Sequence, residues 1–493
     1  MKATSDAGTS GDAVGQIATR PIGRLLWENC AQTIASVSMF GVYALTNAWF
    51  VGHAVGGQGM AAVNVVAPLL LLLGAVSTTV GAGGASLVSR ALAAGDERAA
   101  ARAAGNAFVL YWCTAVLTTV TGLAFIDPFL NLLGARGALH EDARQYAAIL
   151  LCGALSYTGF SSLVRAEGRV GFSTRMWVSA IVVQIILDPL LIFGLDLGVR
   201  GAALGTVGGQ TVSVVMSWWF FFLRRRRPYR IRLADLRPHA GTFGALLGIG
   251  LPSFLANIGI TVLAVLVNDT LAVTGGAAAL AAYVVCSRLQ TFALMPHTGI
   301  SQGLQPIVGY NAGRGLTARV ARTRALALRA SLVYGVATAI FLVLLAEPLV
   351  GLFLDDGRAA GEARYALCVV ALGGIVTGIA PLTAAYFQAL GRPVPAYVLN
   401  IGTVLVLKAP LVAAFAFLWG AHGVWFGLAA GEVTAAATAL LLLRHVDRKS
   451  PPTAGTYSTP GSEPRVPGPR LRLLPSRRRD PVIRPAEYGH GFP

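Results

Sequence analysis

The amino-acid sequence repeats itself at an interval of about 220 residues, and this repeat restricts the possible folds more than any other feature of the chain. The matching positions are Gly83 and Gly303, Gly95 and Gly315, Asp127 and Glu347, Gly168 and Gly391, and Gly198 and Gly420. The offset is 220 at the first three pairs and 223 and 222 at the last two, a drift that small loop insertions explain. The sequence therefore predicts two structurally similar halves.

The composition indicates whether these halves lie in water or in a membrane. Hydrophobic residues make up 55% of the 493 residues and charged residues 12%, and the mean hydropathy is +0.64. Soluble domains carry about 25% charged residues, so we expect this chain to lie in a bilayer. Each spanning helix needs about 20 mostly apolar residues, and the alternating pattern of a membrane barrel is absent. Twelve segments satisfy the requirement: 28–51, 60–88, 104–126, 145–165, 176–196, 201–223, 244–270, 278–302, 325–346, 366–388, 397–418 and 422–443.

The two features together predict an all-α integral membrane protein, with twelve transmembrane helices in two pseudo-symmetric six-helix lobes. Duplicated apolar chains of this kind are typical of secondary transporters, in which the substrate binds between two halves that move against each other. The predicted domains are an N-terminal segment 1–24, an N-lobe 25–223, a basic linker 224–243, a C-lobe 244–445 and a disordered basic tail 446–493.

Arginines mark one side of the membrane. They cluster at alternate ends of the predicted helices, for example at Arg98 and Arg102, at 224–227 and at Arg319 and Arg322. Because basic loops stay in the cytoplasm, we expect both termini to be cytoplasmic in a multi-pass protein of the inner (plasma) membrane. The formal charge of +17 is then mainly a topology signal, and we expect no nucleic-acid partner.

Several motifs give the chain a family resemblance. The segment Gln302-Gly303-x-Gln305-Pro306-x-x-Gly309-Tyr310-Asn311-x-Gly313 is the most specific, and Leu187-Asp188-Pro189 and Phe387-Gln388-Ala389-x-Gly391 support it. With these motifs the chain resembles the multidrug and toxic compound extrusion (MATE) transporters, in particular their MepA-like bacterial branch, from about residue 25 to 444. The resemblance implies two six-helix lobes around a central cavity. It also implies export of amphipathic, often cationic drugs against a sodium or proton gradient, and we expect a monomer in the lipid bilayer.

The resemblance further implies a cation or proton site in the N-lobe, built from an acid in the first helix, an asparagine and an aspartate in the fifth, and a small hydroxyl residue in the sixth. Asp188 and Thr206 match this pattern, and Asp188 is the candidate ligand for sodium. Asn47 stands where the family usually has aspartate, and Gln184 stands where it has asparagine. Read by itself, Asp188 has an alternative role, which is to bond backbone amides freed by Pro189 and so hold a kink.

Other polar residues in the predicted helices are candidates for the substrate cavity, because intramembrane polar groups usually face a cavity or a partner. The candidates are Asn64, Asn268, Arg288, Gln290, Gln302, Gln388 and Lys408. Amides also join helices to one another. For Lys408 we expect a structural ion pair with Glu432 or Asp269 in preference to a substrate contact.

No sequence pattern indicates an enzyme. The chain has no phosphate-binding loop, no zinc-ligand spacing and no nucleophile elbow, so we expect neither catalysis nor a cofactor. The main alternative is a lipid-linked saccharide or polysaccharide flippase of the same wider superfamily, which Lys408 and Arg288 favour. The five cysteines fall in predicted helices, where we expect buried thiols.

Overall fold

The computed structural model describes residues 10–54, 56–157, 160–224, 227–355 and 357–449. These residues form helices, and no strand occurs among them. Nearly all of the predicted tail lies outside the described residues, as do the first nine residues. Ala454–Pro493 is a separate unit from Met1–Thr453, and the account below concerns the described part of the larger unit.

The first half of the chain forms α1 to α9 and three short irregular helical segments. Their bounds are α1 Ser10–Thr19, α2 Ile22–Ala54, α3 Gly56–Ala93, α4 Glu97–Ala124, α5 Ile126–Leu132, α6 Ala138–Cys152, η1 Gly153–Ser156, α7 Phe160–Ala166, α8 Val170–Pro189, η2 Leu190–Gly194, α9 Gly198–Trp218 and η3 Trp219–Leu223. The last of these ends where the sequence predicts, just before a basic run that contains Pro228.

The second half forms α10 to α17, preceded by a single turn in the linker. The bounds are η4 Leu233–Leu236, α10 Ala240–Thr274, α11 Gly276–Gly313, α12 Thr317–Leu344, α13 Ala346–Gly351, α14 Arg358–Gly374, α15 Ile379–Ala389, α16 Pro393–Tyr397, η5 Val398–Lys408 and α17 Ala409–Lys449. The backbone of α17 leaves helical geometry at Trp419 and Gly420, so this long element is two helices joined at a kink.

The predicted repeat is confirmed by the geometry. The helices α11, α12 and α14 begin 220 residues after α3, α4 and α6. Glycines with positive φ recur in the predicted pairs, including Gly95 with Gly315 and Gly198 with Gly420. An ion pair recurs too, because Asp127 bonds Arg144 at 3.1 Å and the equivalent Glu347 bonds Arg364 at 3.1 Å.

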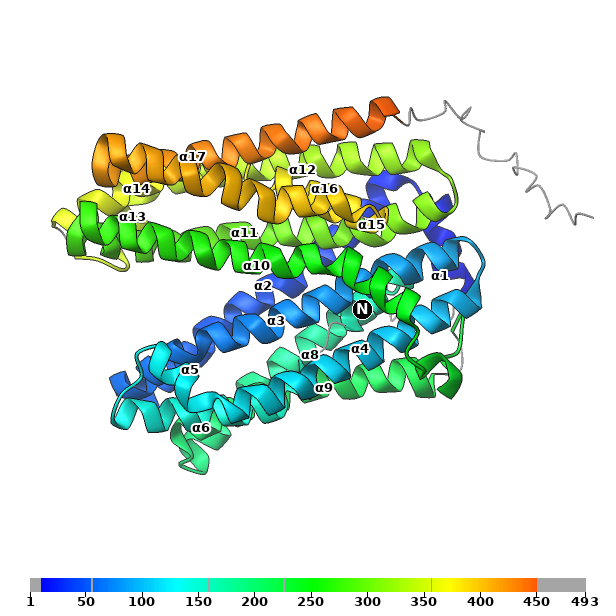
Figure 1. The fold of residues 1–493 in the computed structure, drawn as a ribbon, viewed down its shortest axis with the longest axis horizontal. Helices are drawn as coiled ribbons and strands as arrows, with labels where there is room; N and C mark the ends of the chain where they lie inside the picture. Colours follow the sequence, from blue (N-terminus) through cyan, green and yellow to red (C-terminus); the bar gives the residue numbers. More distant parts are fainter. Residues whose placement is uncertain (1–9, 55, 158–159, 225–226, 356, 450–493) are drawn as a thin grey trace, which may run out of the picture. The chain divides into compact units, whose positions relative to one another are not determined.

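The twelve predicted segments each coincide with a helix or with consecutive helical segments. Ten helical runs in the described part of the chain are long and apolar enough to cross a membrane, and one of them, Pro393–Arg448, contains the kink in α17. Figure 1 shows α2 to α9 in one bundle and α10 to α17 in a second. We use N-lobe and C-lobe for these bundles.

The lobes contact each other through two helix pairs, α3 with α10 and α11 with α2, and glycines of the repeat make these contacts possible. Gly83 of α3 lies against the carbonyl of Leu246 in α10, where a Cβ would collide with the oxygen. The equivalent Gly303 of α11 lies against α2, where a Cβ would come within 3.0 Å of the Cys30 Cα. Close backbone approach at small residues is how helices associate in lipid, where apolar burial alone gives little driving force.

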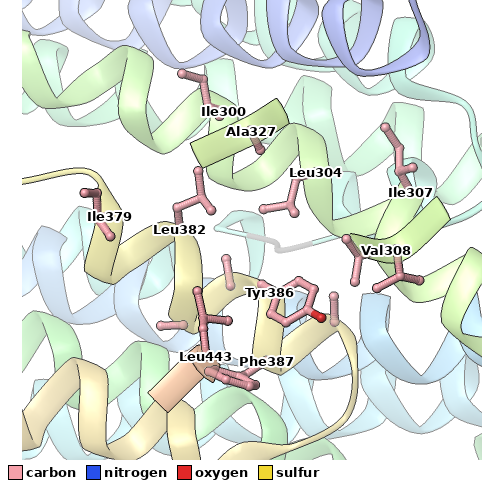
Figure 2. Packing of buried hydrophobic residues seen from close by; sticks show 14 of the residues in the cluster. Ile300, Leu304, Ile307, Val308, Ala327, Ile379, Leu382, Tyr386, Phe387 and Leu443 are labelled. Carbon is pink, nitrogen blue, oxygen red and sulfur yellow. The ribbon is translucent and has the colours of Figure 1, made fainter. Parts of the chain in front are cut away.

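A buried apolar cluster continues this contact. Figure 2 shows its C-lobe part, in which Ile300 and Leu304 of α11 lie near Leu382 and Tyr386 of α15. Leu25 and Cys30 of α2 and Ile17 of α1 belong to the same cluster, so it joins residues of both halves. The thiol prediction is only partly right. Cys30 and Cys286 are buried, but Cys113 and Cys152 are exposed on the helix surface, where apolar surroundings are provided by lipid and not by protein.

An ion pair attaches the linker to the N-lobe. Glu167, which follows α7, pairs with Arg227, and both side chains are almost completely buried. The Arg227 guanidinium also donates to the Phe221 carbonyl at 2.8 Å and lies 4.6 Å from the centre of the Tyr229 ring. Burial alone would lower the pKa of Arg227, but the Glu167 carboxylate raises it above its ordinary value. The arginine therefore stays charged and holds the start of the linker.

A buried asparagine holds the rest of the linker. The Asn106 amide of α4 donates to the Asp235 carbonyl at 3.0 Å, and its oxygen accepts the His239 N–H at 2.9 Å. The described linker residues are thus bonded to the N-lobe at both ends.

Candidate functional site

Asp188 lies at the end of α8 and is completely buried. Neither carboxylate oxygen has a hydrogen-bond partner among the described residues. One oxygen points at Gly205 of α9, so closely that any Cβ at that position would collide with it. A buried carboxylate without partners is stable only when it holds a proton or a cation. The structural alternative required Asp188 to bond freed backbone amides, and no such bond is present among the described residues.

Gln184 and Thr206 lie beside Asp188. Gln184 precedes it by one helical turn, and its amide donates to the Thr206 hydroxyl at 2.8 Å. That hydroxyl donates in turn to the Ala202 carbonyl at 3.0 Å. The structure therefore joins two of the predicted site residues directly and aligns the third on the same helix face. Asn47, the fourth, is buried on α2, a helix that packs against both α8 and α9.

A cavity of about 320 Å³ borders this cluster. Its lining residues are Ser36, Val37, Leu70, Leu71, Gly74, Ala75, Ser77, Thr78, Tyr157, Trp177, Thr206, Gln210, Asn257 and Gln302. Twelve of the fourteen belong to the N-lobe, while Asn257 and Gln302 come from α10 and α11 of the C-lobe. We call this space the central cavity.

The lining of the central cavity suits an amphipathic molecule. It contains hydroxyls, amides and apolar side chains, and none of its lining residues carries a formal charge. The Trp177 ring supplies an apolar face, and its N–H is already bonded to the Ser161 hydroxyl at 3.1 Å. Aromatic faces of this kind also attract cations.

Of the lining residues, the sequence predicts only Gln302 and Thr206 as site residues, and Trp177, Tyr157, Gln210 and Asn257 are not predicted. Gln210 and Asn257 carry a signal that could have found them, because they are amides inside membrane helices. The two aromatic residues carry none, since aromatic side chains are common on every face of a membrane helix.

Three other predicted cavity residues lie elsewhere. Lys408 pairs with Glu432 at 2.6 Å, which confirms the expected structural pair. Gln290 lines a smaller C-lobe cavity of about 90 Å³, together with His297 and Glu432. Gln388 is buried between the lobes, where its side-chain amide donates to the Ser253 hydroxyl and its backbone carbonyl accepts from the Ser86 hydroxyl.

The remaining three candidates, Asn64, Asn268 and Arg288, are exposed on α3, α10 and α11. Within the described residues, no group of three or more His, Cys, Asp or Glu side chains could hold a metal ion.

Comparison with known proteins agrees with this geometry. The family model MatE matches residues 33–190 and 252–414, which are corresponding parts of the two lobes. Multidrug export protein MepA of Staphylococcus haemolyticus is 26% identical over 407 residues, covering 82% of this chain and 89% of that protein. A protein of Shewanella oneidensis named FAD transporter is also 26% identical, over 416 residues, covering 83% of this chain and 91% of the relative.

Solved structures share the fold. A crystal structure of MATE in the straight conformation has a TM-score of 0.84 at 24% identity and covers 89% of this chain and 98% of its own. An outward-facing multidrug resistance transporter of the MATE family and MOP superfamily has a TM-score of 0.81 at 23% identity, with coverage of 91% and 99%. Such structures have twelve helices in two lobes, so the predicted fold class is confirmed.

Proposed function

Because the chain belongs to the MatE family of multi-pass membrane transporters, we propose that it is a secondary active efflux transporter. It exports amphipathic compounds, including cationic drugs, in exchange for protons or sodium ions that move down their gradient. Transporters of this family are not enzymes, and the chain acts as a monomer by exposing its central cavity to each side of the membrane in turn.

One observation carries this proposal. Thr206 belongs both to the buried cluster around Asp188 and to the lining of the central cavity. A change of charge at Asp188 can therefore reach the cavity through α8 and Thr206, because Gln184, one turn before Asp188, donates to the Thr206 hydroxyl. Gain or loss of a proton or cation at Asp188 changes which arrangement of α8 and α9 is stable, and the cavity lining changes with it.

The proposal includes an orientation. The end of the molecule at which α3 meets α11 and α15 carries the arginine-rich loops, so we assign it to the cytoplasm, with both termini on that side of the inner membrane. Alkaline phosphatase fused at residue 444 should be inactive and fused at residue 276 active. The reverse pattern would overturn the orientation.

Drug accumulation in a bacterial host without its own efflux pumps tests the function. Cells that express the chain should retain less ethidium than empty-vector cells. An ionophore that collapses only the proton gradient, or only the sodium gradient, should restore accumulation, depending on which ion is used. Equal accumulation in expressing and control cells, for ethidium and for a panel of other amphipathic drugs, would contradict the proposal.

A second candidate substrate is a flavin nucleotide, because the Shewanella relative bears the name FAD transporter. Measurement of FAD in the growth medium distinguishes a flavin nucleotide from an amphipathic drug as the exported substrate. The flippase alternative loses the support of Lys408, because Glu432 neutralises this lysine inside the C-lobe.

A further inference from the structure

Arg165 is a buried cation without a carboxylate partner. It lies near the end of α7 with 6% of its surface exposed, and its guanidinium donates to the Ser162 hydroxyl at 2.8 Å and the Ser173 hydroxyl at 3.0 Å. In the described part of the chain, no Asp or Glu oxygen lies within ion-pair distance of it. Hydroxyls bring no negative charge, so the charge of Arg165 is not compensated here.

Other embedded cations of this chain are paired differently. Lys408 has Glu432 at 2.6 Å, Arg324 has Asp447 at 2.7 Å, and Arg227 has Glu167. Arg165 differs from these three cations, because among the described residues its guanidinium bonds two hydroxyls and no carboxylate.

Arg165 lines a small cavity between the lobes. The cavity has a volume of about 10 Å³, and its polar lining consists of Arg165, Ser86, Ser89, Ser162, Gln302 and Gln305. These residues come from α3 and α7 of the N-lobe and from α11 of the C-lobe. We call this small cavity, together with the contact between the lobes around it, the seam. Gln302 lines both the seam and the central cavity, so the two spaces adjoin.

A second guanidinium lies at the same contact. Arg90 of α3 donates to the Ser86 carbonyl at 3.1 Å and lies directly against Gly391 of the C-lobe. Arg90 also has no carboxylate within ion-pair distance among the residues that the structure describes. The lining of the seam thus combines the Arg165 cation with hydroxyls and amides and contains no acid, and Arg90 lies at its edge, bonded to the backbone of the lining residue Ser86.

We propose that Arg165, assisted by Arg90, recognises an anionic oxygen group of the substrate, a carboxylate or a phosphate, when the lobes part at the seam. A guanidinium binds such groups through two parallel hydrogen bonds, and Ser89 and Gln305 supply further donors. The site lies on the path from the arginine-rich side into the central cavity. The inference rests on the proposed function, because only alternating access opens the seam.

The test compares two dyes that differ in one group. Rhodamine 110 has a free carboxylate, and rhodamine 123 is its methyl ester. Binding of each is measured by fluorescence polarisation with purified protein in phosphatidylcholine nanodiscs. Arg165→Gln should weaken rhodamine 110 binding about tenfold or more, the loss expected for a charged hydrogen bond, and leave rhodamine 123 binding within twofold. Arg165→Lys should retain most of the affinity, and Arg98→Gln, at an exposed position, should match the wild type.

Gln305→Glu provides an independent variant in case Arg165→Gln does not fold. It adds a carboxylate to the seam and should selectively weaken rhodamine 110 binding. Equal losses for both dyes, no loss, or no rhodamine 110 binding by the wild type would each overturn the proposal. Displacement of rhodamine 110 from the wild type by phosphatidylglycerol would also overturn it, because the anion would then be a lipid headgroup.

Ethidium transport by the same preparation separates this inference from the proposed function. Transport of ethidium without rhodamine 110 binding contradicts the anion site alone. Arg165-dependent binding of rhodamine 110 without transport of any compound contradicts the proposed function alone.

Discussion

Asp188 is the residue on which the proposed coupling depends, because it is completely buried and its carboxylate has no hydrogen-bond partner among the described residues. Asp188→Asn keeps the size of the side chain and removes the charge. We expect this variant to reach the membrane in normal amounts and to reduce ethidium efflux to the empty-vector level. Asp196→Asn is a matched control, since Asp196 is exposed, lies eight residues further on and has a positive φ that asparagine tolerates. Normal efflux by Asp188→Asn would leave the residue with a structural role only.

Asn47 tests the departure from the family pattern at the same scale. Asn47→Asp restores the acid that the resemblance implies in the first long helix. If Asn47 acts with Asp188, the two carboxylates repel each other and retain a shared proton to higher pH. The pH at which transport is fastest should then rise by about one unit. Transport rates measured between pH 5.5 and 9 decide this, and an unchanged profile would separate Asn47 from the coupling site.

Single residues also show where prediction from sequence ends. The buried position of Asp188, its alignment with Gln184 and the pairing of Lys408 with a carboxylate follow from helical spacing and from the high free energy of unpaired charge in a membrane, although the sequence leaves Glu432 and Asp269 open as partners of Lys408. The cavity residues Trp177 and Tyr157 do not follow. Membrane helices are apolar on every face, so the pattern does not reveal which face meets the other lobe.

At the scale of elements, the sequence repeat predicted the arrangement of the helices in more detail than the hydrophobic composition did. It predicted equivalent helices in the two halves, and the starts of α11, α12 and α14 reproduce those of α3, α4 and α6. The contacts of the linker were not predictable, because Glu167 and Arg227 are 60 residues apart and meet only through the packing of α7 and η3. The sequence predicts only a basic connection between the lobes, whereas in the structure the linker is bonded to the N-lobe.

This attachment makes a stability prediction. Glu167→Gln leaves Arg227 buried without its carboxylate, a change that typically costs about 3–5 kcal/mol. We expect the melting temperature of the detergent-purified protein to fall by about 5 °C or more. The double variant Glu167→Gln with Arg227→Met should recover part of the loss, because it leaves no unpaired charge. An unchanged melting temperature in Glu167→Gln would mean that the linker is not held by this pair.

At the scale of the whole molecule, we propose that the lobes rock against each other and that the linker moves with the N-lobe. Ser89 of α3 lies against Gly309 of α11 in this structure. Cysteines at these two positions, in a background without the five native cysteines, should form a disulfide in this conformation and stop transport until reductant is added. Each single cysteine serves as a control. Crosslinking at the same rate with and without substrate and ion gradient would indicate a static seam.

The central claim is that an ion gradient drives transport through Asp188, and reconstituted protein tests it most directly. Ethidium uptake into proteoliposomes is measured while a proton or sodium gradient is imposed across a membrane that contains only this protein. The account predicts uptake above equilibrium with one of the two gradients, none after that gradient is collapsed, and none in Asp188→Asn. Uptake that is the same with and without both gradients, or that persists in Asp188→Asn, would contradict it.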